Sequence, residues 1–230
     1  MADSTYRLDI PTVAIFNSAE LKEFFKKSGY KFAFEYYFEP VLNKSLYEYL
    51  IQHKDDFDRK KQIIVYGRPS TYRNAFELVV AVLKTWVQSY DKAMEWEVLS
   101  LGEQHNEIEL GNGVKLVSKG KMALEEYAKT MLTSSIGISL MVSPHPSYPP
   151  LEMATFGVKT ITNCYDNKDL GAFNSNIVSV KNCSQGNVAE ILVNLCEKYS
   201  PDSVYNYNEE YVSNKNTFES IIEKIKLILQ

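Results

Sequence analysis

Apolar positions change their spacing at regular intervals through most of the chain. Short aliphatic and β-branched runs predict buried strands at 63–66, 96–101, 114–117, 136–142, 158–162 and 177–180. Between them, apolar residues recur every three or four positions, which predicts helices over 73–90, 124–132 and 187–199. A short helix is expected to start near Pro149 and to end at Gly157. The polar segment 103–113 predicts a loop with a turn at Gly111-Asn112-Gly113.

The first 61 residues show the same patterns less regularly. A strand is predicted at 13–16, followed by a helix that Asn17 or Ser18 caps and that ends near Gly29. Residues 31–40 are aromatic and are predicted to be extended, and 43–57 are predicted to form a second helix. At the other end of the chain, a final helix is expected over 216–230.

Alternating strands and helices predict the α/β fold class, with a Rossmann-like parallel sheet covered by helices on both faces. Three regions are expected. Residues 1–61 form a segment that leads into, or packs beside, the main domain. Residues 62–200 form the Rossmann-like domain, and residues 201–230 form a tail and helix.

Composition and charge narrow the possible partners. The net charge is −4 over 230 residues, and no basic cluster offsets it, which argues against nucleic acid. Arg59-Lys60-Lys61 is interpreted as a solvated helix end. No apolar run reaches about 18 residues, so no transmembrane segment is expected. Three cysteines without metal-ligand spacing fit a reducing, cytoplasmic location, with the inner face of the membrane as an alternative.

Three loops that follow predicted strands carry candidate chemistry. Ligands of open parallel sheets bind outside the carboxyl ends of the strands. Arg68 follows the first of these strands, Lys121 follows the third, and the loop from Ser143 to Pro150 follows the fourth. Two cations and a helix start would then converge. This combination suits a diphosphate, because arginine, lysine and free N–H groups all favour anions.

The stretch 142–158 contains four prolines, one histidine, one tyrosine and one carboxylate. Pro149 and Pro150 are expected to preset the first helical turn, which places Glu152 in that turn. Two roles are open for Glu152. It either stabilises the positive end of the helix or accepts hydrogen bonds from the sugar hydroxyls of a nucleotide.

Each other candidate also has a simpler explanation. The simpler explanation for Arg68 is a surface ion pair. For Lys121 and Lys119 it is a solvated charge, and this explanation is favoured more strongly for Lys119. His145 is either a catalytic base or a histidine packed between prolines. Tyr148 either stacks on a base or reaches a phosphate, or else is a packed aromatic residue.

Several nucleotide and hydrolase motifs are absent from the sequence. It has no G-x-x-x-x-G-K-[ST] phosphate loop, no G-x-G-x-x-G fingerprint and no G-x-S-x-G elbow. A sugar-nucleotide epimerase or reductase is therefore disfavoured. Asp166 and Asp169 follow the fifth strand without further metal ligands.

The order of elements resembles a known family. Gly67-Arg68-Pro69 after a strand, and P-P-L-E-M-A-T-F-G-V between two strands, resemble the C-terminal, nucleotide-sugar-binding domain of GT-B glycosyltransferases. The run from Ser143 to Met153 is similar to bacterial rhamnosyltransferases that build surface glycans from dTDP-rhamnose. The likeness includes the segments 16–30 and 37–40 and covers most of the chain.

This resemblance implies roles for individual residues. Glu152 matches the carboxylate that binds the ribose, and Arg68 and Lys121 match the cations at the diphosphate. Tyr148 matches a loop residue near the nucleotide, and His145 lies where the loop approaches the sugar. With Ser143, which opens the motif, these residues form the expected site.

The resemblance also implies a donor, an acceptor and a way of working. The donor would be a dTDP- or UDP-sugar, with rhamnose as the sugar, the acceptor would be a glycan, and no metal cofactor would be needed. Pro144 stands eight residues before Glu152, where the wider family has a second glutamate. About 60 residues precede Gln62, too few for a full acceptor domain, so a separate or missing domain is expected to hold the acceptor. The chain by itself is therefore expected to bind the nucleotide sugar but to show little transfer activity. The rival hypothesis is a non-catalytic nucleotide-binding or interaction module of the same fold.

Overall fold

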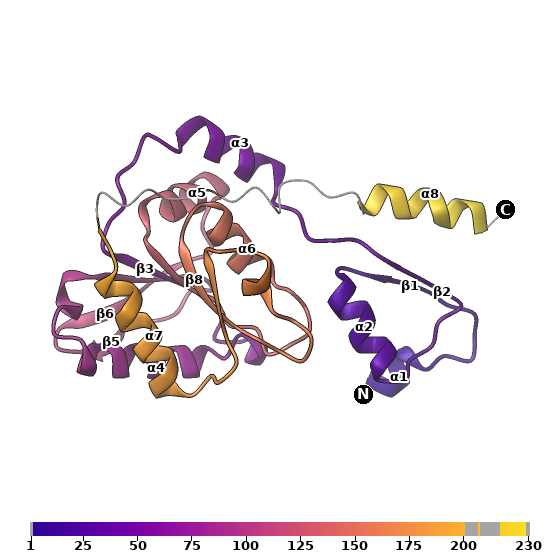
Figure 1. Cartoon of the computed structure of the whole chain (residues 1–230), viewed down its shortest axis with the longest axis horizontal. Coiled ribbons are helices and arrows are strands. Elements are labelled where there is room, and N and C mark those ends of the chain that lie inside the picture. Colours follow the sequence, from indigo (N-terminus) through magenta and orange to yellow (C-terminus); the bar gives the residue numbers. More distant parts are fainter. Residues whose placement is uncertain (1, 201–206, 208–216, 229–230) are drawn as a thin grey trace.

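The computed structural model describes residues 2–200, 207 and 217–228. A seven-stranded sheet forms the middle layer of its larger body (Figure 1). Its strand order is β5-β6-β4-β3-β7-β8-β9. The strands are β3 (Gln62–Gly67), β4 (Glu97–Gly102), β5 (Ile108–Gly111), β6 (Val114–Gly120), β7 (Ile136–Ile138), β8 (Lys159–Asn163) and β9 (Ile177–Val180). All neighbours pair in parallel except β5 and β6. The predicted Rossmann-like fold is confirmed.

Helices cover both faces of this sheet. On one face lie α4 (Phe76–Ser89) and α7 (Gln185–Glu197), and on the other lie α3 (Lys44–His53), α5 (Leu124–Thr133) and α6 (Tyr148–Thr155). Side chains of β3 alternate between the two layers: Ile63 and Val65 join the first core, and Ile64 joins the second. Burial on both faces explains why residues 63–65 of β3 are continuously apolar. Short 3-10 turns occur at Tyr72–Asn74, Ala93–Glu95 and Leu170–Ala172.

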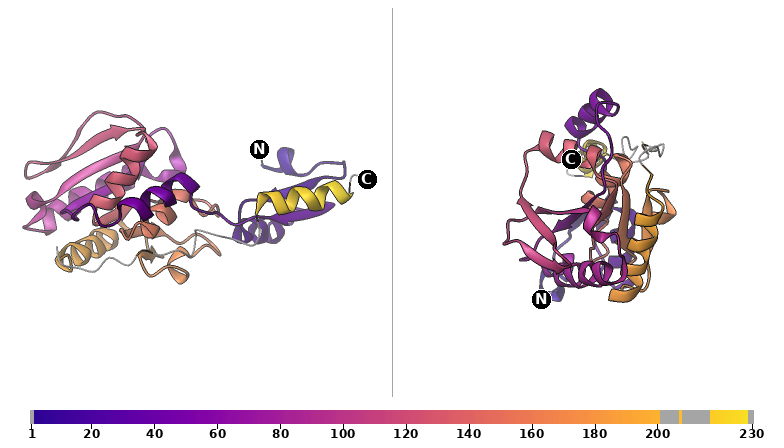
Figure 2. Two further views of the ribbon diagram at one scale, coloured as in Figure 1. Left: turned by 90° about the horizontal axis from the view of Figure 1, so that it is seen from above. Right: turned by 90° about the vertical axis from the view of Figure 1, so that its left-hand side faces the viewer.

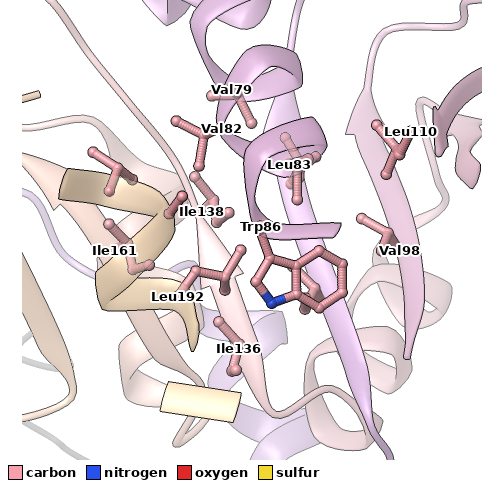
Figure 3. Close-up of a cluster of buried hydrophobic side chains, with 14 of the residues drawn as sticks. Val79, Val82, Leu83, Trp86, Val98, Leu110, Ile136, Ile138, Ile161 and Leu192 are labelled. Carbon is pink, nitrogen blue, oxygen red and sulfur yellow. The ribbon is translucent and has the colours of Figure 1, made fainter. Parts of the chain in front are cut away.

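The core under α4 and α7 is built around Trp86. Figure 3 shows its indole between α4 and the sheet, beside Ile136 of β7 and Leu192 of α7. Trp86 and Leu192 are fully buried. The helical spacing of apolar residues in 73–90 and 187–199 therefore marked the faces that meet here.

Two sequence predictions were wrong in detail. The segment 103–113 contains β5, which runs antiparallel to β6 through a tight turn at Asn112 and Gly113, both with positive φ. Too few of its residues are apolar for the sequence pattern to predict this edge strand. The strand predicted at 136–142 pairs only over Ile136–Ile138. Ser139 N–H still donates to Ile161 O at 3.0 Å, and Met141 N–H donates to the Asn163 side chain, at Oδ1, at 2.6 Å.

A small unit lies beside this domain. It comprises α1 (Ala2–Tyr6), β1 (Val13–Phe16), α2 (Ala19–Lys27) and β2 (Phe34–Tyr37), with β1 and β2 paired in parallel. The last helix, α8 (Phe218–Ile228), packs along it, and the Phe38 and Phe218 rings lie 5.7 Å apart (Figure 2). We call α1, β1, α2, β2 and the loops between them the N-terminal unit.

The predicted segment 1–61 thus divides in space. Its first part forms the N-terminal unit, whereas α3 packs against α5 of the Rossmann-like domain and buries Leu46 and Leu50 there (Figure 1). The predicted tail 201–230 lies outside the described residues except for residue 207 and 217–228.

The helices that the structure describes are all too short or too polar to cross a membrane.

Candidate functional site

A cleft of about 640 Å³ lies at the carboxyl edge of the sheet, between the ends of β3 and β6 and the start of α6. Five of the six predicted site residues line it: Arg68, Lys121, His145, Tyr148 and Glu152. They come from three different loops or helix starts. The convergence that was expected from the strand order is present.

Arg68 is exposed at the end of β3. Gly67, the residue before it, lets the Phe76 ring lie against the backbone, because a Cβ on residue 67 would lie 2.4 Å from that ring. In the part of the chain that the structure describes, no carboxylate forms an ion pair with Arg68. Its guanidinium faces the cleft beside Tyr66, the pKa of which burial raises and Arg68 lowers.

Lys121 and Lys119 separate across the sheet. Lys121 lines the cleft, whereas Lys119 lines a different hollow beside Trp96 and Lys115. Gly120 turns the chain between them with a φ of +61°. Both lysines are exposed, so only their position distinguishes a candidate ligand contact from a solvated charge.

Arg73 is a third cation that the sequence analysis missed. It was assigned to a helix over 73–90, but Ala75 adopts a left-handed φ of 48° and α4 begins at Phe76. Arg73 therefore lies in the 3-10 turn before α4 and lines the cleft, and Val142 N–H donates to its carbonyl at 2.7 Å. Asn74 beside it is buried and donates to Leu140 O at 3.3 Å. Only the left-handed residue could have signalled this, and alanine is not typical of that position.

The start of α6 differs from the expectation in two ways. Pro149 and Pro150 do lie in the first turn. Because prolines carry no N–H, this turn presents fewer donors to an anion than an ordinary helix start. Glu152 lies beyond the first turn, so stabilisation of the positive helix end is a weaker explanation for it.

Glu152 is instead held by a tyrosine. Tyr127 of α5 donates its hydroxyl to Glu152 Oε2 at 3.0 Å. Burial raises the pKa of Glu152, and this hydrogen bond partly offsets the effect. Tyr127 lines the cleft together with Glu152. Burial and the nearby Glu152 also raise the pKa of Tyr148.

Both ring nitrogens of His145 have partners. Ser147 N–H donates to Nδ1 at 2.9 Å, and the side-chain amide of Asn17 contacts Nε2. Burial, Lys168 and Arg73 lower the pKa of His145, so the neutral ring is favoured. The neutral ring must carry its proton on Nε2, toward the N-terminal unit. Ser147 itself has a positive φ of 68°, a strained conformation that this hydrogen bond supports.

Ser143 is the predicted residue that does not reach the cleft. It accepts a hydrogen bond from His145 N–H at 3.2 Å and lines a neighbouring cavity of about 670 Å³ against the N-terminal unit. Phenylalanines of that unit form much of the wall, and Arg73 and His145 line both cavities. Among the described residues, no group of three or more histidine, cysteine, aspartate or glutamate side chains could hold a metal ion.

Comparison with known proteins identifies the family. The family described as WsaF, C-terminal domain, matches residues 61–193, which is more than half of the chain. The chain belongs to the WsaF C-terminal domain family. Its match begins beside β3 and includes the whole cleft edge. A relative is the O-antigen biosynthesis protein RfbC of Myxococcus xanthus, 29% identical over 127 residues that cover 55% of this chain and 10% of that protein.

Solved structures share the fold of this WsaF C-terminal domain protein. Sucrose-phosphate synthase from Thermosynechococcus elongatus has a TM-score of 0.63 at 13% identity, over 94% of this chain and 57% of that chain. WaaG, a glycosyltransferase involved in lipopolysaccharide biosynthesis, has a TM-score of 0.56 at 13% identity, over 94% and 62%. The UDP-forming α,α-trehalose-phosphate synthase from Burkholderia vietnamiensis has a TM-score of 0.61 at 7% identity, over 81% and 52%.

These similarities show the α/β fold of GT-B glycosyltransferases. The chain spans little more than half the length of these structures and a tenth of the curated relative.

Proposed function

We propose that this chain is the donor-binding half of a glycosyltransferase of glycan biosynthesis, with the nucleoside diphosphate of a nucleotide sugar in the cleft. One observation carries the proposal. Arg68, Arg73 and Lys121 converge on the cleft from separate loops, and no carboxylate among the described residues forms an ion pair with them. A diphosphate supplies the missing negative charge.

In this proposal the three cations hold the diphosphate and stabilise its charge as the sugar–phosphate bond breaks. Protein cations take the part that a metal ion has in other transferases. Glu152, oriented by Tyr127, accepts hydrogen bonds from the ribose hydroxyls. Tyr148 contacts the nucleotide from the start of α6.

A catalytic role for His145 carries a structural condition. Nδ1 is occupied by Ser147 N–H, so a base lone pair becomes available only if the ring changes partners. Because Nε2 faces Asn17, movement of the N-terminal unit would release that end of the ring. In this proposal Ser143 acts at the boundary with the N-terminal unit and does not contact the nucleotide.

For the donor we propose dTDP-rhamnose, on the similarity of the Ser143–Met153 motif alone. For the acceptor we propose a glycan, in keeping with the O-antigen relative. The acceptor half would be supplied by further polypeptide that packs on the N-terminal unit. Two parallel strands do not normally form a sheet by themselves, and α2 has no buried residue although one side of it is apolar.

Calorimetric titration with dTDP and UDP, with and without Mg²⁺, tests the proposal. We expect micromolar to millimolar dissociation constants that do not depend on Mg²⁺. Lys121→Ala should weaken binding about tenfold, the effect of one lost charge-assisted contact. Lys119→Ala is the matched control, since its side chain lines another hollow. Absence of binding, or equal losses in both variants, would refute the assignment.

Turnover separates an enzyme from a binding module of the same fold. With an acceptor half supplied, dTDP-rhamnose should be consumed, and Lys121→Ala should slow this more than Lys119→Ala. Tight nucleotide binding without any turnover in that assembly would favour the non-catalytic alternative.

A further inference from the structure

Lys168 lies in a tight turn after β8, beneath the loop that joins β7 to α6. Its side chain is only 1% exposed. Nζ donates to Met141 O at 2.7 Å and to His145 O at 3.4 Å. One ammonium group therefore holds both ends of the segment 141–145, which forms the wall between the cleft and the N-terminal unit.

The turn that carries Lys168 is held by its own backbone and by contacts with α2. Backbone hydrogen bonds join Tyr165 and Lys168 in both directions, at 3.1 and 2.9 Å. Asn167 Nδ2 donates to Glu20 O of α2 at 3.0 Å, and Asp166 pairs with Lys27 at 3.5 Å. Lys168 thus connects the nucleotide-facing loop to a turn that rests on the N-terminal unit.

Lys168 has no acidic partner in the described part of the chain. The groups that face its ammonium are the carbonyls of Met141 and His145, the His145 ring, the thiols of Cys164 and Cys183, and the Tyr165 ring at 6.0 Å. Burial of a lone ammonium costs several kcal/mol, and an apolar side chain of similar volume often costs less. The ammonium fixes the positions of the two carbonyls it contacts, which an apolar side chain could not do.

The segment that Lys168 holds leads directly to the site. His145 accepts the Ser147 N–H, Ser147 precedes α6 with its positive φ, and α6 carries Tyr148 and Glu152 into the cleft. A displacement of the Met141 or His145 carbonyl would therefore move the start of α6.

We propose that Lys168 is a positioning residue for the nucleotide site: its ammonium sets the backbone of 141–147, and through it the start of α6 and Glu152. This inference rests on the proposed function. Burial lowers the pKa of Lys168 to about 8. His145, with a lowered pKa, and the two thiols, with raised pKa values, do not change charge between pH 7 and 8.5. The affinity for dTDP should therefore fall as the pH rises through about 8.

The test compares Lys168→Met with Lys159→Met in the full chain. Lys159 is an exposed lysine at the opposite end of β8, and it donates to Ser175 O and Asn176 Oδ1. At pH 7, Lys168→Met should weaken dTDP binding about tenfold and remove the pH dependence. It should speed amide hydrogen exchange in 141–148, whereas Lys159→Met should not.

Wild-type affinity and pH profile in Lys168→Met would overturn the inference. If that variant does not fold, the wild-type protein still decides, because a flat dTDP affinity between pH 7 and 9 contradicts a role for the ammonium. Failure of the wild-type protein to bind dTDP or UDP refutes the proposed function instead. In that case, unchanged exchange in 141–148 of Lys168→Met refutes the positioning by itself.

Discussion

The two edges of the seven-stranded sheet use cations in opposite ways. At the edge where the strands begin, Arg59 is only 8% exposed. Its guanidinium donates to Met131 O at 2.8 Å and to the carbonyls of Ser134 and Phe156. These carbonyls end α5 and α6, where the helix dipole favours a cation. The interpretation of Arg59 as part of a solvated helix end was wrong.

At the edge where the strands end, Arg68, Arg73 and Lys121 are exposed, and no hydrogen bond from their side chains to the described residues is present. The fold supplies three carbonyl acceptors to Arg59 and none to the side chains of the other three among the described residues. The difference teaches that the partners of a cation, rather than its type, separate a structural role from a binding role.

Arg59→Ala tests the structural side of this comparison, and we expect it to have the largest effect of the substitutions described here. Three buried carbonyls lose a charged donor, which should lower the free energy of unfolding by about 3–5 kcal/mol. The melting temperature should fall by about 10 °C, measured by thermal denaturation. Lys60→Ala, an exposed neighbour, is the control. Equal melting temperatures for the two variants would show that Arg59 is not structural.

Arg68→Ala should give the converse result. The affinity for dTDP should fall about thirtyfold, because a charge-assisted contact contributes about 2 kcal/mol. The melting temperature of the ligand-free protein should not change, since no partner in the fold is lost. Calorimetry and thermal denaturation measure the two quantities. A large loss of stability would place Arg68 in the same class as Arg59.

Glu152→Gln should separate stability from binding at one residue. Burial raises the pKa of Glu152 in the folded state, so the stability it contributes is present at low pH and is lost as the pH rises through that pKa. The variant should therefore be more stable than the wild type at pH 7, with the difference vanishing below about pH 4. Its dTDP affinity should fall about tenfold. A less stable variant at pH 7 would contradict this.

Tyr127→Phe should have the smallest effect. It removes only the hydroxyl that orients Glu152, which should cost about 1 kcal/mol of dTDP binding, or roughly fivefold in affinity. Combined with Glu152→Gln, it should add almost nothing, because the two residues act together. Fully additive losses in a double-mutant cycle would show that Tyr127 acts independently.

Local pattern was sufficient for the architecture and for much of the site. The spacing of apolar residues determined the strand and helix order, since burial on a sheet face or helix face follows a short repeat. Parallel strands then had to bring Arg68, Lys121 and Glu152 to one edge, because their loops follow strand ends. Even so, the sparse apolar pattern of β5 was too weak to predict, because an edge strand buries little.

Tertiary structure alone decided which polar groups have partners. Arg59 and Arg68 look alike in sequence, yet one is enclosed by two helix ends and the other is not. Arg73 entered the cleft through the left-handed Ala75, Tyr127 reached Glu152 from another helix, and Lys168 holds a loop more than 20 residues before it. Such contacts join residues that are distant in the chain, and no local repeat encodes them.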